Sequence, residues 1–250
     1  MRVEISEKGS VDKVRFINDH SDGPFGVRRS VVTTDWVALE DAAFAIWAAR
    51  TSDLHGFAET VLDAGEACGV FRLVTVAEDG SDPQPFEDRA FLQARPSPFE
   101  LPFDDTPDGR WLATPARLAW WENGELREGD VPWVGALLER LHPGVDPDFA
   151  KRWMSWTAPL EIWGTRDFVH ITLRTDAWFP RTLALDPAHV PISLPRPAHD
   201  NRAAARVHTP RLNRFLATLR HAADDWQQLD PEGIGKLYDD MTDASGILLD

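Results

Sequence analysis

Cysteine is nearly absent from this sequence: Cys68 is the single one among 250 residues. A disulfide within the chain is therefore excluded, and a zinc site built from cysteine ligands is not expected. A lone thiol is typical of proteins from reducing compartments. The cysteine content therefore predicts a cytoplasmic protein.

Long apolar runs are also missing. No stretch approaches the roughly 18 consecutive apolar residues that a membrane helix needs. The first residues, MRVEISEKGSVDK, have no apolar run behind their charges, so they do not resemble a secretory signal. The sequence thus predicts a soluble protein without a membrane partner.

Positive charge is scarce. The chain has 26 basic residues, only four of them lysine, against 41 acidic residues, and its formal net charge is −15. Because nucleic-acid phosphates require a positive protein surface, a nucleic-acid partner is not expected. An acidic surface attracts basic proteins instead. The preference for arginine over lysine, with abundant alanine, proline and glycine, indicates a GC-rich genome and therefore a bacterial protein.

The charge is unevenly distributed along the chain. Residues 35–110 carry −11 and residues 222–250 carry −7, whereas residues 181–221 carry +5. Two interpretations of this basic stretch, which includes residues 196–220, remain open. It lies against an acidic surface of its own fold, or it contacts an anion or a partner.

Motifs that would identify a cofactor or a metal are lacking. The glycines form neither a Walker loop nor a G-x-G-x-x-G pattern after a strand. The eight histidines include no H-x-x-x-H pair. The stretch AHDNR, with His199 and Asp200, is interpreted as a polar loop. We therefore predict no cofactor and no metal.

The sequence does contain a mixture of strand and helix patterns. Short stretches such as RVEIS and KVRFI predict strands near the N-terminus. Amphipathic spacing predicts five helices, over residues 34–47, 53–65, 132–141, 146–156 and 211–229. The predicted fold class is α+β, with a mainly antiparallel, twisted sheet and helices packed mostly on one face.

A proline-rich stretch from Pro83 to Pro107 favours a division into two subdomains. Proline fixes φ and lacks the backbone donor, so a central strand is not expected there. The predicted units are an N-terminal α+β half over 1–95, a connection over 96–110 and a tryptophan-rich α+β half over 111–250. One continuous domain is the alternative.

Tryptophan is abundant, with 11 residues. Trp120 and Trp121 precede an Asn-Gly pair at 123 and 124, which favours a tight hairpin turn. Because adjacent strand residues face opposite sides, one of these two tryptophans is expected to be exposed. Trp153 and Trp156, at i and i+3, would share a helix face. These four are the candidate partner-binding residues.

The stretch EIWGTRDFVHITLRTDAW, residues 161–178, predicts a second hairpin with GTRD as its loop. In this register Glu161 faces His170 across the strands. Alternation places one apolar set on the core face: Leu160, Ile162, Val169, Ile171 and Leu173. The opposite face carries Glu161, Trp163, Phe168, His170, Thr172 and Arg174.

A carboxylate beside an imidazole has chemical consequences. Glu161 at about 5 Å would raise the pKa of His170 and orient its ring as a general base requires. These two residues are the candidate catalytic pair. Thr172, Arg174 and Trp163 are the candidate substrate-binding residues, with Arg174 suited to an anion and Trp163 to an apolar wall.

Two functions from different classes are consistent with these features. The first is a non-catalytic protein-binding protein, of the bacterial inhibitor, immunity or adaptor kind, with an acidic and tryptophan-bearing surface. The alternative is a hydrolase or small-anion-binding enzyme on the Glu-His-Thr-Arg strand face, and a third hypothesis is aromatic-ligand stacking on the tryptophans. Because no complete catalytic motif is present, we expect the first.

Overall fold

The structure is a computed structural model that describes the chain in segments separated by gaps. The described residues are 2–5, 14–17, 43–71, 75–76, 84–85, 112–114, 116–122, 124–131, 158–164, 168–182, 199–231 and 233–249. The helices predicted over 132–141 and 146–156 lie outside these residues, and so do Trp153 and Trp156.

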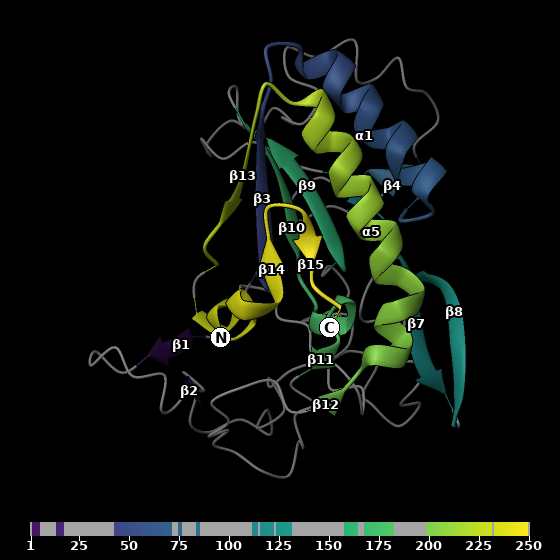
Figure 1. The fold of residues 1–250 in the computed structure, drawn as a ribbon, viewed down its shortest axis with the longest axis vertical. Helices are drawn as coiled ribbons and strands as arrows, with labels where there is room; N and C mark the ends of the chain where they lie inside the picture. Colours follow the sequence, from purple (N-terminus) through teal and green to yellow (C-terminus); the bar gives the residue numbers. More distant parts are fainter. Residues whose placement is uncertain are drawn as a thin grey trace.

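The main sheet has five strands in the order β13-β3-β10-β9-β6 (Figure 1). Each neighbouring pair in it is antiparallel. The α+β class with a mainly antiparallel sheet is thus confirmed. The strands are β3 (Ala45–Arg50), β6 (Leu112–Thr114), β9 (Leu160–Gly164), β10 (Phe168–Leu173) and β13 (Asp225–Leu229).

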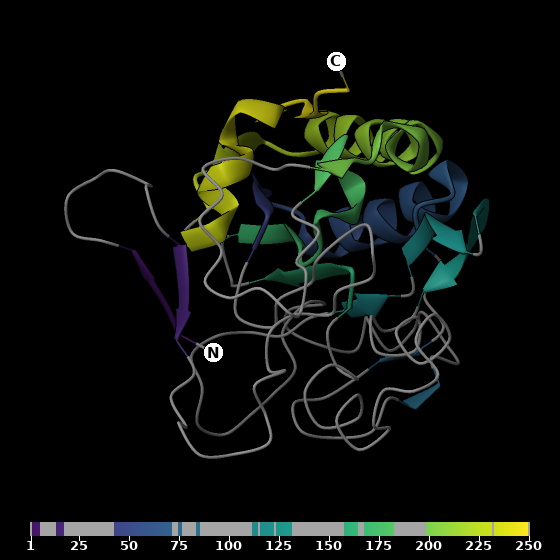
Figure 2. The ribbon, with the colours of Figure 1, turned by 90° about the horizontal axis from the view of Figure 1, so that it is seen from below.

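Two α-helices in the described part of the chain, α1 (Leu54–Cys68) and α5 (Arg202–Ala222), pack against each other on one side of this sheet (Figures 1 and 2). The apolar face of the sheet meets them in one hydrophobic core. The five residues predicted for the core face, Leu160, Ile162, Val169, Ile171 and Leu173, are all 0% exposed. Alternation along the two strands therefore predicted the buried face correctly.

Shorter elements complete the described structure. Two 3-10 helices are η1 (Asp176–Trp178) and η2 (Gly233–Met241). Antiparallel pairs are formed by β1 (Arg2–Ile5) with β2 (Val14–Ile17), β4 (Thr75–Val76) with β5 (Gln84–Pro85), β7 (Ala116–Glu122) with β8 (Glu125–Val131), β11 (Arg181–Thr182) with β12 (His199–Asp200), and β14 (Thr242–Asp243) with β15 (Gly246–Ile247). The strands predicted in RVEIS and KVRFI are confirmed.

The helix predicted over 34–47 is wrong at its C-terminal end, because Ile46 and Trp47 belong to strand β3. Residues 34–42 lie outside the described part of the chain. β3 runs between β10 and β13, so both of its edges are hydrogen-bonded. Trp47 on the core face and Ala48 on the other face are both buried. A run buried on two faces loses the apolar-polar alternation that identifies a strand.

Helix α1 begins where the sequence predicts it and ends later. The Asp53 side chain accepts a hydrogen bond from the Gly56 N–H at 2.9 Å and caps the N-terminus. Gly65, the predicted stop, lies inside the helix, where a Cβ atom would come within 2.3 Å of the Phe71 ring. The helix ends instead at Gly69, whose φ of 67° closes a left-handed cap.

Helix α5 is displaced from the helix predicted over 211–229. It begins nine residues earlier and includes Pro210. Residues 225–229 form strand β13 instead, so Trp226 lies on a strand and not on a helical stripe. Pairing of this segment with β3 replaces the helical hydrogen bonds that the amphipathic pattern predicted.

The hairpin at Asn-Gly is confirmed as β7 and β8, with Glu122 opposite Glu125. Gly124 has a φ of 78°, the left-handed conformation that a two-residue hairpin turn requires. The hairpin lies at one margin of the molecule (Figure 1).

The predicted division into subdomains stays a prediction, since the connection over 96–110 lies outside the described residues. Strand β3 comes from the predicted N-terminal half, whereas its neighbours β10 and β13 come from the C-terminal half. The described parts of both halves therefore share one sheet. None of the described helices has the length and apolarity needed to cross a membrane.

Candidate functional site

The first candidate site is the histidine face, defined as the sheet face with Glu161, Trp163, Phe168, His170, Thr172 and Arg174. The observed register differs by two residues from the predicted one: His170 lies opposite Trp163, and Glu161 lies opposite Thr172. The connection between the strands is one residue shorter than GTRD. A shift by two preserves the alternation, so all of these residues stay on the predicted face. The predicted Glu161–His170 pairing is wrong.

His170 has aromatic neighbours where a carboxylate was expected. Its ring stacks on Trp163 with centroids 4.0 Å apart and 7° between the planes. Phe168 lies 6.4 Å away, and the Arg50 guanidinium lies over the Phe168 ring at 5.3 Å. The buried Nδ1 of His170 has no hydrogen-bond partner in the described part of the chain. Burial lowers the pKa of His170, the opposite of the predicted direction.

The two ionic groups of the histidine face bind each other. Arg174 Nε donates to Glu161 Oε2 at 2.6 Å, and both side chains are about four-fifths buried, with 22% and 18% exposed. Trp163 Nε1 donates to the buried Thr172 Oγ1 at 3.2 Å. The guanidinium of Arg174 is therefore already paired with a carboxylate of the protein itself. Glu161 orients this arginine and not the imidazole of His170.

Replacing His170 with phenylalanine tests whether the imidazole has a polar role in the folded protein. Phenylalanine preserves the stacking on Trp163 and removes a buried nitrogen that lacks a hydrogen bond. We expect the free energy of unfolding at neutral pH to stay within about 1 kcal/mol of the wild-type value or to rise. Urea denaturation measures this. A loss above about 2 kcal/mol would contradict the geometry described, and His170→Ala, which removes the stacking, is the comparison variant.

The second candidate site is the hairpin surface, defined as Trp121, Leu126 and the outer edge of β8. Trp120 is 4% exposed and Trp121 is 37% exposed, so the two tryptophans face opposite sides as predicted. Trp121 lies directly opposite Leu126, which is 38% exposed. Leu126 was not among the candidate residues, because a single leucine in a mostly charged strand gives no local signal.

Among the described residues, the outer backbone edge of β8 is unpaired and forms part of the hairpin surface. Arg117 N–H donates to the Val70 carbonyl and thus points away from β8. The register then makes Trp121–Leu126 a non-hydrogen-bonded pair, whose backbone groups point outward. No described strand pairs with the outer edge of β8. Such an edge can accept an added strand from another chain.

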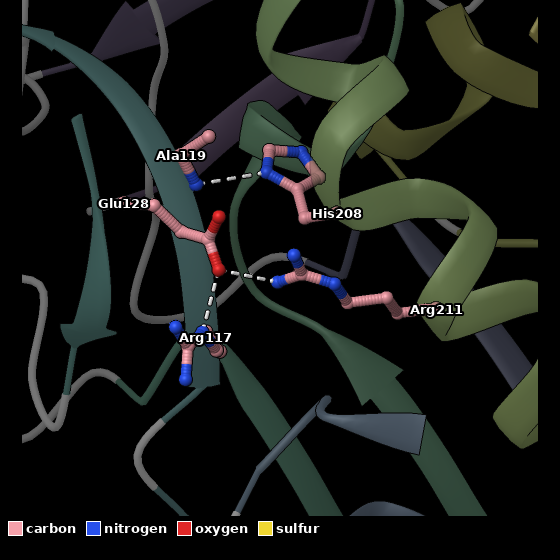
Figure 3. Close-up of polar contacts among 5 residues, drawn as sticks. All are labelled: Arg117, Ala119, Glu128, His208 and Arg211. Carbon is pink, nitrogen blue, oxygen red and sulfur yellow. Dashed lines mark hydrogen bonds and ion pairs between the residues drawn. The ribbon is translucent and has the colours of Figure 1, made fainter. Parts of the chain in front are cut away.

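An ionic cluster attaches the hairpin to helix α5 (Figure 3). Glu128 Oε1 accepts from Arg117 Nε at 2.6 Å and from Arg211 Nη1 at 2.7 Å. Hydrogen bonding to Arg211, aided by Arg117, lowers the pKa of Glu128 to about 2. Glu128 and Arg211 are 83 residues apart in the sequence, so no local pattern predicted this cluster.

His208 of α5 is fully buried beside the same hairpin (Figure 3). Its Nδ1 accepts from the Ala119 N–H at 3.0 Å, which leaves the ring proton on Nε2, 2.7 Å from the Ala177 carbonyl. Burial lowers the pKa of His208 to about 4, so the ring is neutral at pH 7. Both nitrogens therefore bind backbone groups, and the residue joins α5 to β7 and η1.

The described residues contain no group of three or more His, Cys, Asp or Glu side chains arranged to hold a metal. Asp200, from the stretch AHDNR, binds the Arg202 guanidinium through both carboxylate oxygens, at 2.8 and 2.6 Å. The carboxylate of Asp200 is therefore engaged in an ion pair and not in a metal site.

In comparisons with known proteins, neither a family model nor a curated protein nor a solved structure matched this chain.

Proposed function

We propose that this protein is a non-catalytic protein-binding protein of the bacterial inhibitor, immunity or adaptor kind, and that its partner docks on the hairpin surface. The observation that carries the proposal is the exposed cross-strand pair of Trp121 and Leu126. A large aromatic side chain beside an aliphatic one, at a strand edge, is typical of the centre of a protein interface.

The outer edge of β8, which no described strand occupies, suggests how the partner binds. An extended partner segment adds a strand to this edge through main-chain hydrogen bonds, and its side chains select the site. An apolar side chain of that segment would contact Leu126 and Trp121. The exposed Asp130 on the same strand favours a basic side chain opposite it, whereas Glu125 is paired with Arg127 at 2.5 Å.

The charge of the whole chain favours the same kind of partner. A net charge of −15 attracts a basic protein and speeds the encounter at low ionic strength. Nucleic acid and membrane surfaces are not among the proposed partners, since both carry negative charge. The lone cysteine favours a cytoplasmic location, which is part of the proposal.

Replacing Trp121 with alanine is expected to weaken partner binding by about 30- to 100-fold, the usual effect of truncating a central aromatic contact. Purified basic proteins encoded beside the gene are the candidates, and calorimetry at about 50 and 200 mM salt measures the affinity. Leu248→Ala is the matched control, because Leu248 is 40% exposed and lies outside the hairpin. It should change affinity less than about twofold.

Two outcomes would count against this function. One is the lack of any salt-sensitive complex with those basic proteins. The other is a complex whose affinity is equal in the wild type and in Trp121→Ala, which would place the partner elsewhere on the molecule.

The hydrolase alternative receives no comparable support from the histidine face. Its carboxylate and its guanidinium bind each other, and its imidazole stacks on Trp163. A screen of ester and phosphoester substrates distinguishes the two functions. An activity lost in His170→Ala would favour the enzyme over the binding protein.

A further inference from the structure

Helix α5 has the opposite charge to the rest of the chain. Its 21 residues include five arginines and no acidic residue. The chain carries −15 in total, so α5 contributes +5 and the remaining residues carry −20. The basic stretch noted in the sequence is therefore largely one helix, which lies along the outer side of the molecule (Figure 2).

Two of the five arginines are used within the fold. Arg202 binds Asp200 and Arg211 binds Glu128. The remaining three, Arg206, Arg214 and Arg220, are exposed, and no described residue forms an ion pair with them. The interpretation that the basic stretch lies against an acidic surface of its own fold thus applies to Arg211 directly. Arg206 and Arg220 interact electrostatically with Asp200 and Asp243, respectively, without forming an ion pair with them.

Helical geometry places the three exposed arginines on one side, which we call the arginine stripe. At 100° per residue, Arg206, Arg214 and Arg220 fall within an arc of about 120°, opposite the buried residues of the helix. Along the axis they cover about 21 Å, close to four turns. Within this arc the helix also presents the small side chains of Pro210 and Ala217. Asn213, near one border of the arc, binds the Ile247 backbone of β15, so a partner would approach the helix from the side of Arg206 and Arg214.

We propose that the arginine stripe is a second docking surface, which binds an acidic helical segment of another protein. Carboxylates repeated every turn along about 20 Å would meet the guanidinium groups, whose planar donors bind carboxylates well. This surface is separate from the hairpin surface and of opposite charge. Its presence would make the protein an adaptor between two partners, and it stands independently of the proposed function.

Charge also favours a short acidic segment over nucleic acid. A nucleic-acid duplex is a long polyanion that would extend past the stripe and over the remaining chain, which carries −20. Repulsion reaches about 8 Å at physiological salt, so it acts wherever the duplex passes the acidic surface. A segment no longer than the stripe avoids this repulsion.

A fluorescent peptide of about 14 residues, which spans about 21 Å as a helix, is the probe, with glutamate at every fourth position on an alanine and glutamine background. Anisotropy should show binding at about 50 mM salt that weakens at about 200 mM. The double variant R206E/R214E should bind roughly tenfold more weakly or worse. The single variants R214E and K236E make the same change in net charge, and K236E, at an exposed residue outside α5, is the control that should bind within about twofold of wild type.

Several results would overturn the proposal. Equal binding of a scrambled peptide with the same composition, or of single-stranded DNA with matched charge, would mean unspecific attraction to polyanions. Unchanged peptide binding by R206E/R214E would place the peptide site elsewhere on the protein. Absence of peptide binding at low salt would show that the proposed site does not exist. Salt-sensitive self-association that R206E/R214E abolishes, measured by sedimentation, would identify a second copy as the occupant instead.

Discussion

Replacing Trp47 with alanine is expected to lower the free energy of unfolding by about 3–5 kcal/mol, the largest loss we predict for a single side chain. Trp47 is 0% exposed on β3, the strand with neighbours on both edges. Its indole N–H also donates to the Asp243 carbonyl at 2.9 Å. The substitution therefore leaves a large cavity in the core and loosens the C-terminal segment.

Urea denaturation monitored by circular dichroism measures the loss in Trp47→Ala. Trp226→Ala is the matched control, because Trp226 lies on the adjacent strand β13, is only half-buried, and donates to the Ala244 carbonyl at 2.8 Å. It should cost about 1–2 kcal/mol. A loss below about 1 kcal/mol in Trp47→Ala would mean that β3 does not pack at the centre of the core.

Lowering the pH from 7 to about 4 is expected to destabilise the protein through His208. The pKa of this ring is about 4 in the folded protein and 6.5 as the ordinary value. The unfolded chain therefore binds more protons between these values, and stability falls as the pH falls through this window. The full difference corresponds to roughly 3 kcal/mol. Protonation of Nδ1 also breaks its hydrogen bond from Ala119.

The variant His208→Gln isolates this contribution. Glutamine has an oxygen that can accept from Ala119 and an amide that can donate to Ala177, but it does not titrate. Its stability should depend less on pH between 6.5 and 4 than that of the wild type. Glu128, whose pKa is about 2 in the folded protein and 4.5 as the ordinary value, also lowers stability below about pH 5, but it is present in both proteins, so the difference between them reports on His208. Identical pH dependence in the two proteins would contradict the buried neutral His208.

Local sequence patterns were sufficient to predict the two hairpins. The Asn-Gly turn required left-handed conformations that favour a hairpin, and alternation identified the buried face of β9 and β10. The register of β9 against β10 was predicted with an error of two residues. Loops of three and four residues are both common in hairpins, and an even shift keeps every side chain on the same face. The sequence therefore predicted the histidine face but not the partner of His170.

The boundaries of β3 and α5 could not be predicted from local patterns. The segment AIWAAR is alanine-rich and suits a helix by propensity, yet strands from distant parts of the chain pair with both of its edges. Helix α5 contains Pro210, a residue that is disfavoured inside a helix. Side-chain hydrogen bonds to η1 hold the N-terminal part of the helix in place. His208 and Asn201 bind the Ala177 carbonyl, and Thr209 binds the Trp178 carbonyl. These bonds join residues more than 20 positions apart.

The sequence alone determined the α+β class, the two hairpins, the core face of β9 and β10 and the uneven charge, because each depends on residue type and short-range spacing. Only the tertiary structure decided which tryptophan is exposed, which ion pairs form and which arginines of α5 are left facing solvent. Those properties depend on contacts between distant segments, whose approach is governed by the packing of the whole core.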